Sequence, residues 1–464
     1  MAVTGGNDLT RGNAAVNLLK FTVPFLLAFF IQFLYSAADM AIVGRYGGGP
    51  AGVSAVASGS EVMHLVMSLI MGLTAGATVL IGRFYGAQDT DNAARCTGMT
   101  LSVGVLASAV MTAVMVPSVP WIAGMLRTPP EAWAETISYA TICSWGIIFI
   151  AGYNALSAIF RGFGNSNAPL LFVGIACAVN VIGDLLLVAG LGMGVAGAAY
   201  STVASQALSM VFAIFFLLKS NFGFRLKMSD FRISLWMLKR LASVGVPIGI
   251  QNVMVGLSFL FLFAIVNKMG VASSAAYGIG GKINGFAMLP AIAFSMAVSA
   301  IAAQNMGANK PKRALVTLRL AVTYTLIFGA GALTVLQLFP EFFVRVFLAD
   351  GGTGKTAEDA ARAADTMTAA VGFIRSFSWE FILVPVVFCT NGFFNGCGRA
   401  FFSMANNLGS TFLVRVPAAW LLSLIPGATL FHVGFAAPLA SFASNLVAVY
   451  YLLSGKWRPK RNAR

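Results

Sequence analysis

Long stretches of apolar residues recur along the chain from residue 17 almost to its end. Within them, segments such as 103–116 and 207–218 carry no charge and lack the alternation over about ten residues that a transmembrane β-strand shows. A run of about 20 apolar residues crosses the hydrocarbon core of a membrane as a helix. The pattern therefore predicts twelve membrane-spanning helices, over residues 17–43, 53–80, 98–126, 134–161, 168–190, 194–219, 240–267, 275–305, 314–340, 366–396, 402–425 and 431–454.

Composition places these helices in lipid. The chain of 464 residues is 58% hydrophobic and only 10% charged, and its mean hydropathy of +0.83 lies far outside the range of soluble domains. The 49 glycines let helix backbones approach closely, which matters because lipid provides no hydrophobic drive for helices to associate. We predict an all-α integral membrane protein.

The net charge of +15 is a signal of membrane topology. Lys and Arg concentrate in short polar segments on one side of the predicted helices, and that side is expected to face the cytoplasm. This predicts a multi-pass protein of the cell inner membrane with both termini cytoplasmic. The richest basic segments are residues 219–240, 310–319 and 456–464. Because the bases are spread over several loops, we expect them to meet anionic membrane lipid and not nucleic acid.

Several common kinds of functional site are missing from the sequence. The five cysteines have no pair at metal-ligand spacing, neither histidine has a metal-ligand companion, and no GxxxxGK[ST] loop is present. The first apolar stretch is longer than the core of a signal peptide, so we expect it to remain as a span. We therefore expect no enzyme, no resident metal or cofactor, and no obligate protein partner.

The two halves of the chain resemble each other. Residues 24–47 align without gaps on residues 247–270 and keep the proline, an Ile-Val pair and the closing glycine. Further matches follow in the same order, pairing 84–87 with 305–308, 160–164 with 394–398, and 194–201 with 434–441.

This repeat predicts how the chain is divided. We expect an N-terminal six-helix lobe at residues 1–219, a cytoplasmic basic linker at 220–239 and a C-terminal six-helix lobe at 240–464. Six spans in each copy make the repeats parallel, with two bundles around a central cleft. Rocking of the bundles exposes such a cleft to each side of the membrane in turn.

Acidic residues inside the predicted helices are candidates for function. An Asp at the centre of a membrane helix costs roughly 2.5–3.5 kcal/mol, so it is expected to face a cavity or a partner, or to be protonated. Asp184 lies mid-span, with Asn180 one turn earlier on the same face. Four acids lie inside predicted spans: Asp39, Glu61, Asp184 and Glu380.

The first predicted helix carries a polar face. Gln32, Tyr35 and Asp39 fall at i, i+3 and i+7, and we expect this face to contact substrate. Pro24 removes a backbone donor from the same helix, which favours bending between two shapes. Methionines of other spans adapt to varied ligands, although packing is the expected role of most of them; the candidates are Met63, Met67, Met71, Met254 and Met288.

Glu61 and Glu380 are weaker candidates. Glu61 and His64 lie three residues apart, which allows a local pair or a proton-sensitive spot. Glu380 aligns with Gly146 of the other half. Its charge could be offset by pairing with Arg375 or by exposure to water at the outer surface.

Residues 155–206 (ALSAIFRGFGNSNAPLLFVGIACAVNVIGDLLLVAGLGMGVAGAAYSTVASQ) closely resemble the multidrug and toxic compound extrusion (MATE) family, and within it the DinF-like branch. The stretches DMAIVG at 39–44 and GLTAGATVLIGRFYG at 72–86 support this resemblance, which covers essentially the whole chain. It implies an antiporter that exports organic cations or amphipathic compounds by alternating access, driven by inward flow of protons or sodium ions. It also implies that coupling involves Asp39, Asn154, Asn180, Asp184 and Thr202.

Two carboxylates in a poorly hydrated lobe suit proton coupling, because burial and mutual repulsion both disfavour their charged forms. Sodium is the alternative ion, since hard cations prefer oxygen ligands such as those of Asp39, Asn180, Asp184 and Thr202. A structural alternative is that Asn180 and Asp184 only tie helices together and that Asp39 is solvated. Against it, the repeat places Leu262 and Ala418, and no acids, opposite Asp39 and Asp184.

Other functions remain open on the sequence. A lipid-linked oligosaccharide flippase of the same wider superfamily would use intramembrane bases to meet a pyrophosphate, and Lys282 and Arg415 are the candidates. An ion channel or a membrane-bound enzyme is disfavoured because no selectivity-filter sequence or metal-ligand set occurs. The other MATE branch keeps an acid in the seventh span, and its absence here puts an ion site in the second half in doubt.

Overall fold

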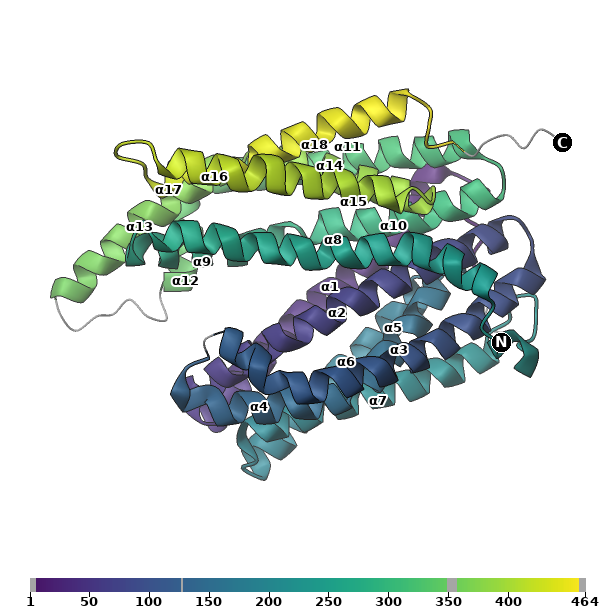
Figure 1. The fold of residues 1–464 in the computed structure, drawn as a ribbon, viewed down its shortest axis with the longest axis horizontal. Helices are drawn as coiled ribbons and strands as arrows, with labels where there is room; N and C mark the ends of the chain where they lie inside the picture. Colours follow the sequence, from purple (N-terminus) through teal and green to yellow (C-terminus); the bar gives the residue numbers. More distant parts are fainter. Residues whose placement is uncertain (1–5, 127, 349–356, 459–464) are drawn as a thin grey trace. The chain divides into compact units, whose positions relative to one another are not determined.

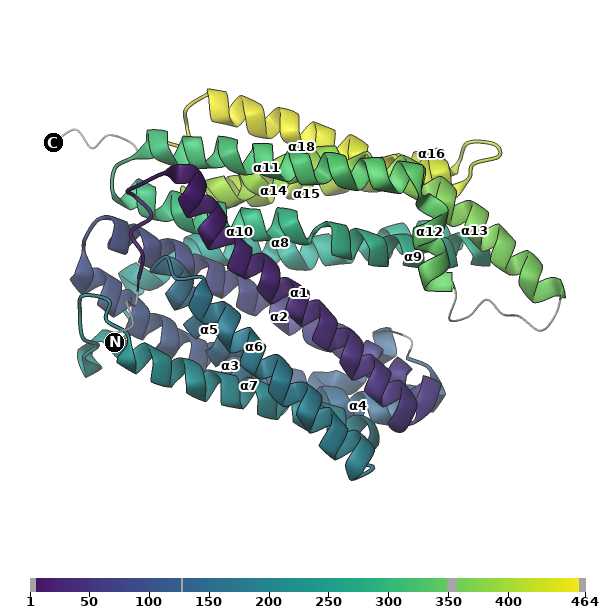
Figure 2. The same cartoon turned by 180° about the vertical axis from the view of Figure 1, so that it is seen from behind.

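The computed structural model describes residues 6–126, 128–348 and 357–458. Within those residues the chain consists of helices joined by short loops (Figure 1; Figure 2 from behind). It forms two compact units: unit 1 contains residues 1–249 and 303–310, and unit 2 contains residues 250–302 and 311–464. The last residues of the basic C-terminal segment, 459–464, lie outside the described residues.

Unit 1 is built from seven helices of its own and the start of an eighth. They are α1 (Ala14–Tyr46), α2 (Gly49–Gly86), α3 (Thr90–Met125), α4 (Pro130–Trp145), α5 (Ile147–Gly162), α6 (Asn167–Asp184) and α7 (Gly194–Lys219). A π-helix, η1 (Leu185–Gly190), continues α6, and a short 3-10 helix, η2 (Met228–Phe231), precedes α8 (Leu235–Asn267). The boundary between the units falls inside α8.

Unit 2 contains the remaining elements. They are α9 (Val271–Ala287), α10 (Leu289–Gly307), α11 (Pro311–Leu338), α12 (Pro340–Leu348), α13 (Ala357–Phe377), α14 (Glu380–Gly396), α15 (Ala400–Gly409), the π-helix η3 (Ser410–Arg415), α16 (Val416–Ser423), α17 (Leu430–Gly434) and α18 (Ala436–Leu453). The end of α10, from Ala303, belongs to unit 1 by its contacts.

The predicted all-α fold is confirmed, and each predicted span lies on helix. Among the described residues, nine helices are long and apolar enough to cross a membrane, and two bent pairs, α4–α5 and α13–α14, bring the number to eleven. The predicted span 402–425 is formed by α15, η3 and α16, so the π-helix divides it. The short helix α12 was not predicted.

The internal repeat is visible in the irregularities of the helices. α1 and α8 both run for 33 residues through a proline, Pro24 and Pro247. The fourth span of each half is broken, by 52° between α4 and α5 and by 51° between α13 and α14. The fifth span of each half contains a π-helix, η1 or η3. These shared breaks support the duplication that the sequence indicates.

Two apolar clusters lie in the described part of unit 1. One cluster contains Ala28 of α1 and Phe172 of α6, and the other contains Val43 of α1 and Val188 of η1. Along α1 and α6, the residues between these clusters include Asp39 and Asp184. The fold therefore places both acids inside the unit, away from either end.

Candidate functional site

Asp39 and Asp184 lie together in unit 1. α1 packs against α6, and the two carboxyl groups interact directly with each other. Asp39 is 7% exposed and Asp184 is fully buried. Within the described residues, Oδ1 of Asp39 and both side-chain oxygens of Asp184 have no hydrogen-bond partner. Within the described residues the pair is therefore buried without the cation that usually stabilises buried carboxylates.

Asn180 links the acid pair to α7. Its Nδ2 donates to Oγ of Ser201 at 3.3 Å and to Oγ1 of Thr202 at 3.4 Å. The Ser201 hydroxyl lies beside Asp184 but donates to the backbone oxygen of Asn180 at 2.7 Å. The Ser201 hydroxyl therefore donates its hydrogen to the backbone of α6. Oδ1 of Asn180 has no hydrogen-bond partner among the described residues.

A glycine makes this approach of α6 and α7 possible. A Cβ added at Gly183 would lie 2.5 Å from Oγ of Ser201, a distance that real Cβ atoms essentially never show. Gly183 is adjacent to Asp184 in α6, so this close contact also places Ser201 next to the acid. Small residues at helix interfaces of membrane proteins serve this purpose.

The π-helix η1 begins directly after Asp184. Its N–H···O bonds include Leu191 N to Leu186 O at 2.9 Å. A π-helical turn inserts an extra residue and re-aims the side chains before it, and such turns occur often at functional sites. Asp184 therefore stands at a break in its own helix.

Two tyrosine side chains lie near Asp39. Tyr35, one turn earlier on α1, interacts electrostatically with Asp39, as does Tyr139 of α4. Tyr139 also forms a side-chain hydrogen bond with Ser60 of α2. The neighbouring Gly59 makes room for the ring, because a Cβ added there would lie 2.5 Å from Cδ1 of Tyr139. The polar face predicted on α1 is thus joined to the acid pair at Tyr35.

Sequence reasoning missed Ser201 and Tyr139. Ser201 ends the repeated stretch at 194–201, which was the available signal, but its role depends on the contact with Gly183. Tyr139 shares no helix with the acids and carries no local signal. Both enter the site through packing between helices that are distant in sequence.

The other predicted residues lie elsewhere or contribute less. Asn154, half-buried on α5, donates to the carbonyl of Ile150 in its own helix at 2.8 Å. Gln32 is half-buried on α1, and Pro24 is buried within α1, which continues through it as one helix. Glu61 and His64 are exposed on α2, and among the described residues no ion pair joins them.

Glu380 forms a separate site in unit 2. Its Oε1 accepts a hydrogen bond from Oγ of Ser441 at 2.7 Å, while Oε2 is buried without a partner among the described residues. Arg415 acts on it electrostatically, but its guanidinium lies over the ring of Phe259 at 4.6 Å. Among the described residues no ion pair joins Glu380 to Arg375, the partner suggested by the sequence. Ser441 and Arg415, and not Arg375, face Glu380.

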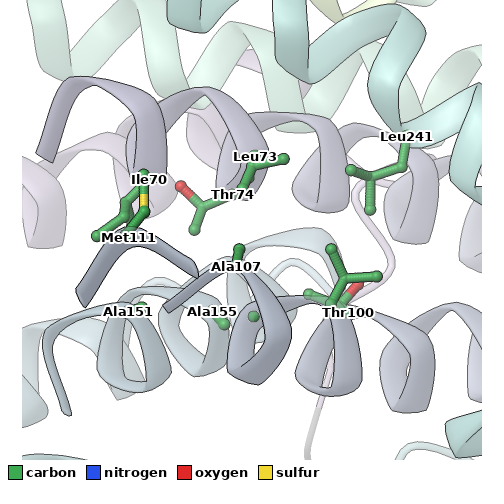
Figure 3. Close-up of a pocket in the computed structure, with 11 residues that line it drawn as sticks. Ile70, Leu73, Thr74, Thr100, Ala107, Met111, Ala151, Ala155 and Leu241 are labelled. Atoms are coloured by element: carbon green, nitrogen blue, oxygen red, sulfur yellow. The ribbon is translucent and has the colours of Figure 1, made fainter. Parts of the chain in front are cut away.

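A small hollow of about 30 Å³ lies in unit 1 between α2, α3, α5 and the start of α8 (Figure 3). Its lining is almost entirely apolar. The hydroxyls of Thr74 and Thr100 donate to backbone carbonyl oxygens of their own helices, those of Met71 at 3.1 Å and Cys96 at 2.7 Å. The acid pair does not line this hollow.

The oxygens around the acid pair suit a small hard cation. Oδ1 of Asp39, Oδ1 of Asn180 and both oxygens of Asp184 are buried without donors in the described part of the chain. Oxygen atoms are the ligands that hard cations prefer. By contrast, the described residues contain no group of three His, Cys, Asp or Glu side chains that could hold a metal ion.

Known proteins resemble this chain over almost its full length. A probable multidrug resistance protein of Bacillus subtilis strain 168, YpnP, is 24% identical, with 97% of each chain covered. A second one from the same strain, YoeA, is 26% identical and is matched over 96% of this chain and 94% of its own. A solved structure described as the outward-facing conformation of a multidrug resistance MATE family transporter of the MOP superfamily has a TM-score of 0.87, with 21% identity and 97% and 98% of the chains covered.

The family pattern provides the assignment. The two copies of the MatE pattern match residues 24–186 and 247–421, one in each half of the chain and together covering most of it. The first match contains Asp39, Asn180 and Asp184, and the matched structure confirms the all-helical fold. The chain belongs to the MATE family of transporters.

Proposed function

We propose that this transporter is a secondary active multidrug efflux antiporter, which exports organic cations or amphipathic compounds in exchange for protons. The observation that carries the proposal is the buried Asp39–Asp184 pair, whose two carboxyl groups interact with each other and form no ion pair within the described residues. The relatives named as multidrug resistance proteins support export of such compounds.

The electrostatics of the pair supply a coupling mechanism. Two adjacent carboxylates in a dry site repel each other, so a proton, a sodium ion or a cationic substrate has to offset their charge. These species compete for the same negative charge, and reciprocal linkage makes binding of one weaken binding of the other. Entry of protons from outside then favours release of the cation. Rocking of the two repeats would carry the site from one side of the membrane to the other.

Sodium is the alternative coupling ion. The residues that would hold it are Asp39, Asn180, Asp184 and Thr202. The first three carry buried oxygens without a partner among the described residues, and the Thr202 hydroxyl accepts from Asn180. Proton coupling is preferred because a carboxyl pair can share a proton directly, without a full cage of ligands.

The position of the acids also supports the DinF-like branch. Both lie in unit 1, and α8, the seventh span, contains no acidic residue. The flippase alternative would need bases free to hold a pyrophosphate. Arg415 instead lies over Phe259 and acts on Glu380, so the charges favour a cationic cargo.

Transport in proteoliposomes tests the proposal. The purified chain is reconstituted, a proton or a sodium gradient is imposed separately, and accumulation of tetraphenylphosphonium is followed. We expect accumulation with the proton gradient alone, lost in Asp184→Asn and kept in Glu131→Gln, which removes an exposed acid of the same unit. Accumulation with the sodium gradient alone would transfer the coupling to sodium. Equal transport by wild type and Asp184→Asn would overturn the role of the pair.

A further inference from the structure

The segment that precedes α1 is fixed to the end of α5. The backbone N of Asn7 donates to the carbonyl of Phe163 at 2.9 Å, and Nδ2 of Asn7 donates to the carbonyl of Gly164 at 3.1 Å. Gly164 has a φ of 79°, and a Cβ there would overlap the carbonyl oxygen of Asn7. We call residues 6–11 the N-terminal strap. Its first residues are therefore held against unit 1 by specific backbone contacts.

The N-terminal strap is also bound to the end of α10. The backbone N of Leu9 donates to Oε1 of Gln304 at 3.0 Å, and Nε2 of Gln304 donates to the carbonyl of Gly162 at 3.0 Å. Leu9 is 5% exposed and Gln304 is fully buried. Nζ of Lys310 donates to the carbonyl of Thr10 at 3.0 Å. The side chain of Gln304 thus joins three elements: the N-terminal strap, α5 and α10.

The exposed part of the N-terminal strap contributes less to this attachment. Oδ1 of Asp8 accepts from the backbone N and Oγ1 of Thr10 at 2.9 and 2.6 Å, and Arg11 pairs with Asp8 at 3.2 Å. The side chains of Asp8 and Arg11 are 34% and 80% exposed, so water screens their ion pair, and such pairs add little stability. Buried hydrogen bonds cost more to break, because the remaining partner is left without water. Gln304 is therefore the main attachment.

The end of α10 packs tightly on the end of α2. A Cβ at Gly86 would overlap the carbonyl oxygen of Gln304, and a Cβ at Gly307 would overlap the carbonyl oxygen of Arg83. The internal repeat pairs residues 84–87 with 305–308, so Gly86 and Gly307 are equivalent positions. Two equivalent helix ends of the repeat therefore meet at one point, and Gln304 is part of that contact.

α10 is shared between the two units. Its residues up to Ala302 belong to unit 2, and those from Ala303 belong to unit 1. The proposed rocking changes the relation between the units, so it has to release the end of α10 or bend the helix. The basic residues 310–319 that follow predict that this end faces the cytoplasm. The N-terminal strap therefore binds α10 where an opening to the cytoplasm would begin.

We propose that the N-terminal strap is a latch that holds the cytoplasmic gate closed, the gate being the contact of the end of α10 with α2 and α5. Gln304 is the residue that locks it. Opening of the gate breaks the two buried hydrogen bonds of Gln304 and separates the end of α10 from the other two helices. The inference rests on the proposed alternating access, but not on the identity of the coupling ion or on the Asp39–Asp184 pair.

Accessibility of the end of α10 tests the latch. Ala303 is fully buried, so the thiol of Ala303→Cys reacts with a maleimide only when the gate opens. Labelling of the purified full chain is followed by peptide mass spectrometry, which separates position 303 from the five native cysteines. Adding Gln304→Leu is expected to speed labelling about tenfold, because loss of two buried hydrogen bonds favours the open gate. Cys96, buried in the same unit, is expected to stay unlabelled.

A milder pair of variants separates the latch from general loosening. Lys310→Met removes the bond to Thr10 and is expected to speed labelling at position 303 severalfold. Lys312→Met removes an exposed base two residues further on and is expected to label as wild type. Wild-type rates in both latch variants, equal effects of Lys310→Met and Lys312→Met, or equal labelling of Cys96 in both latch variants would overturn the proposal. This assay needs no transport, so its result is independent of whether the proposed antiport is correct.

A reversible cross-link distinguishes a moving gate from a permanent anchor. A Cβ at Gly82 of α2 would lie 3.3 Å from the Cβ of Ala303, close to the separation of about 3.8 Å in a disulfide. We expect oxidised Gly82→Cys/Ala303→Cys to lose export of tetraphenylphosphonium and to regain it on reduction. Gly82→Cys alone is the control and is expected to export under both conditions. Full export by the cross-linked protein would show a fixed anchor and would refute the latch.

Discussion

Asp39 and Asp184 are defined by the partners they lack as much as by their position. Most buried carboxylates in proteins accept several hydrogen bonds or meet a base. Here three of the four carboxyl oxygens are buried without a donor in the described part of the chain, and the nearest hydroxyl, Ser201, donates elsewhere. A site with this deficit is costly as a purely structural feature, which favours a role in binding a proton or a cation.

Asp184→Asn is the sharpest change at this scale. It keeps the size of the side chain and the Asn180–Ser201 contacts but removes the titrating group. We expect substrate export to fall to the level of empty liposomes, while the thermal unfolding temperature stays close to that of wild type. Export at the wild-type rate, measured with the Glu131→Gln control alongside, would contradict the assignment.

Asp8 offers a test of ionisation outside the membrane-spanning segments. Burial pushes the pKa of Asp8 up, but hydrogen bonds from Thr10 and the charges of Arg11 and Lys310 outweigh it, so the pKa lies below its usual value of 3.8. A lowered pKa contributes stability above the unfolded value and loses it as pH falls through the folded one. We expect Asp8→Asn to lower the unfolding temperature at neutral pH, with the difference from wild type disappearing well below about pH 4. A difference that persists in acid would show a role independent of charge.

At the scale of helices, the site depends on how closely α6 approaches α7. Asn180 and Asp184 reach Ser201 and Thr202 only because Gly183 has no side chain to keep the helices apart. The π-helix η1 then begins directly after Asp184. Packing and backbone irregularity therefore act together to place the acid.

Gly183→Ala tests this close packing. The new methyl would overlap Oγ of Ser201, and the forced separation of α6 and α7 is expected to lower the free energy of unfolding by about 1–3 kcal/mol. Gly174→Ala is the matched control, because the same helix has open space there, and a slight stabilisation is expected. Unfolding of both variants by denaturant provides the measurement. Equal stability of the two variants would show that the helices adjust freely.

The sequence predicts the participants of the site better than its geometry. Spacing within one helix places Asn180 one turn from Asp184 and Tyr35 one turn from Asp39, and the structure has both pairs. The contacts of Ser201 with Asn180 and of Tyr139 with Asp39 join different helices, and single-sequence periodicity says nothing about which faces meet. The π-helix was also missed, because it is set by backbone packing and not by a residue pattern.

At the scale of the whole chain, the duplication explains both the fold and its asymmetry. Prolines in α1 and α8 and two breaks of nearly equal angle mark the same events in each half, and the alignment of 24–47 on 247–270 predicts the first of these. The fifth span of each half also contains a π-helix, but at positions that do not align. The chemistry is not duplicated. Asp39 and Asp184 align with Leu262 and Ala418, and Glu380 of unit 2 has its own partners in Ser441 and Arg415.

This asymmetry predicts that the site cannot be moved by copying its acids. In an Asp39→Asn/Asp184→Asn background, the added changes Leu262→Asp and Ala418→Asp are expected to leave transport abolished. The reason is that the π-helix lies at a different place in the two spans: Asp184 directly precedes η1, whereas Ala418 comes after η3. Recovery of tetraphenylphosphonium export in the quadruple variant would show that two acids at repeat-related positions suffice.

The central claim is that the Asp39–Asp184 pair binds proton and cationic substrate in competition. The most direct test is the affinity of the purified protein for tetraphenylphosphonium between about pH 5 and pH 8, in wild type and in Asp39→Asn. Because proton and cation weaken each other, wild type is predicted to bind more tightly as pH rises, and a coupling of ~1.4 kcal/mol gives a tenfold change in affinity. Asp39→Asn, which is permanently neutral at that position, is predicted to bind weakly with little dependence on pH. Equal affinities and equal pH slopes in the two proteins would contradict the account.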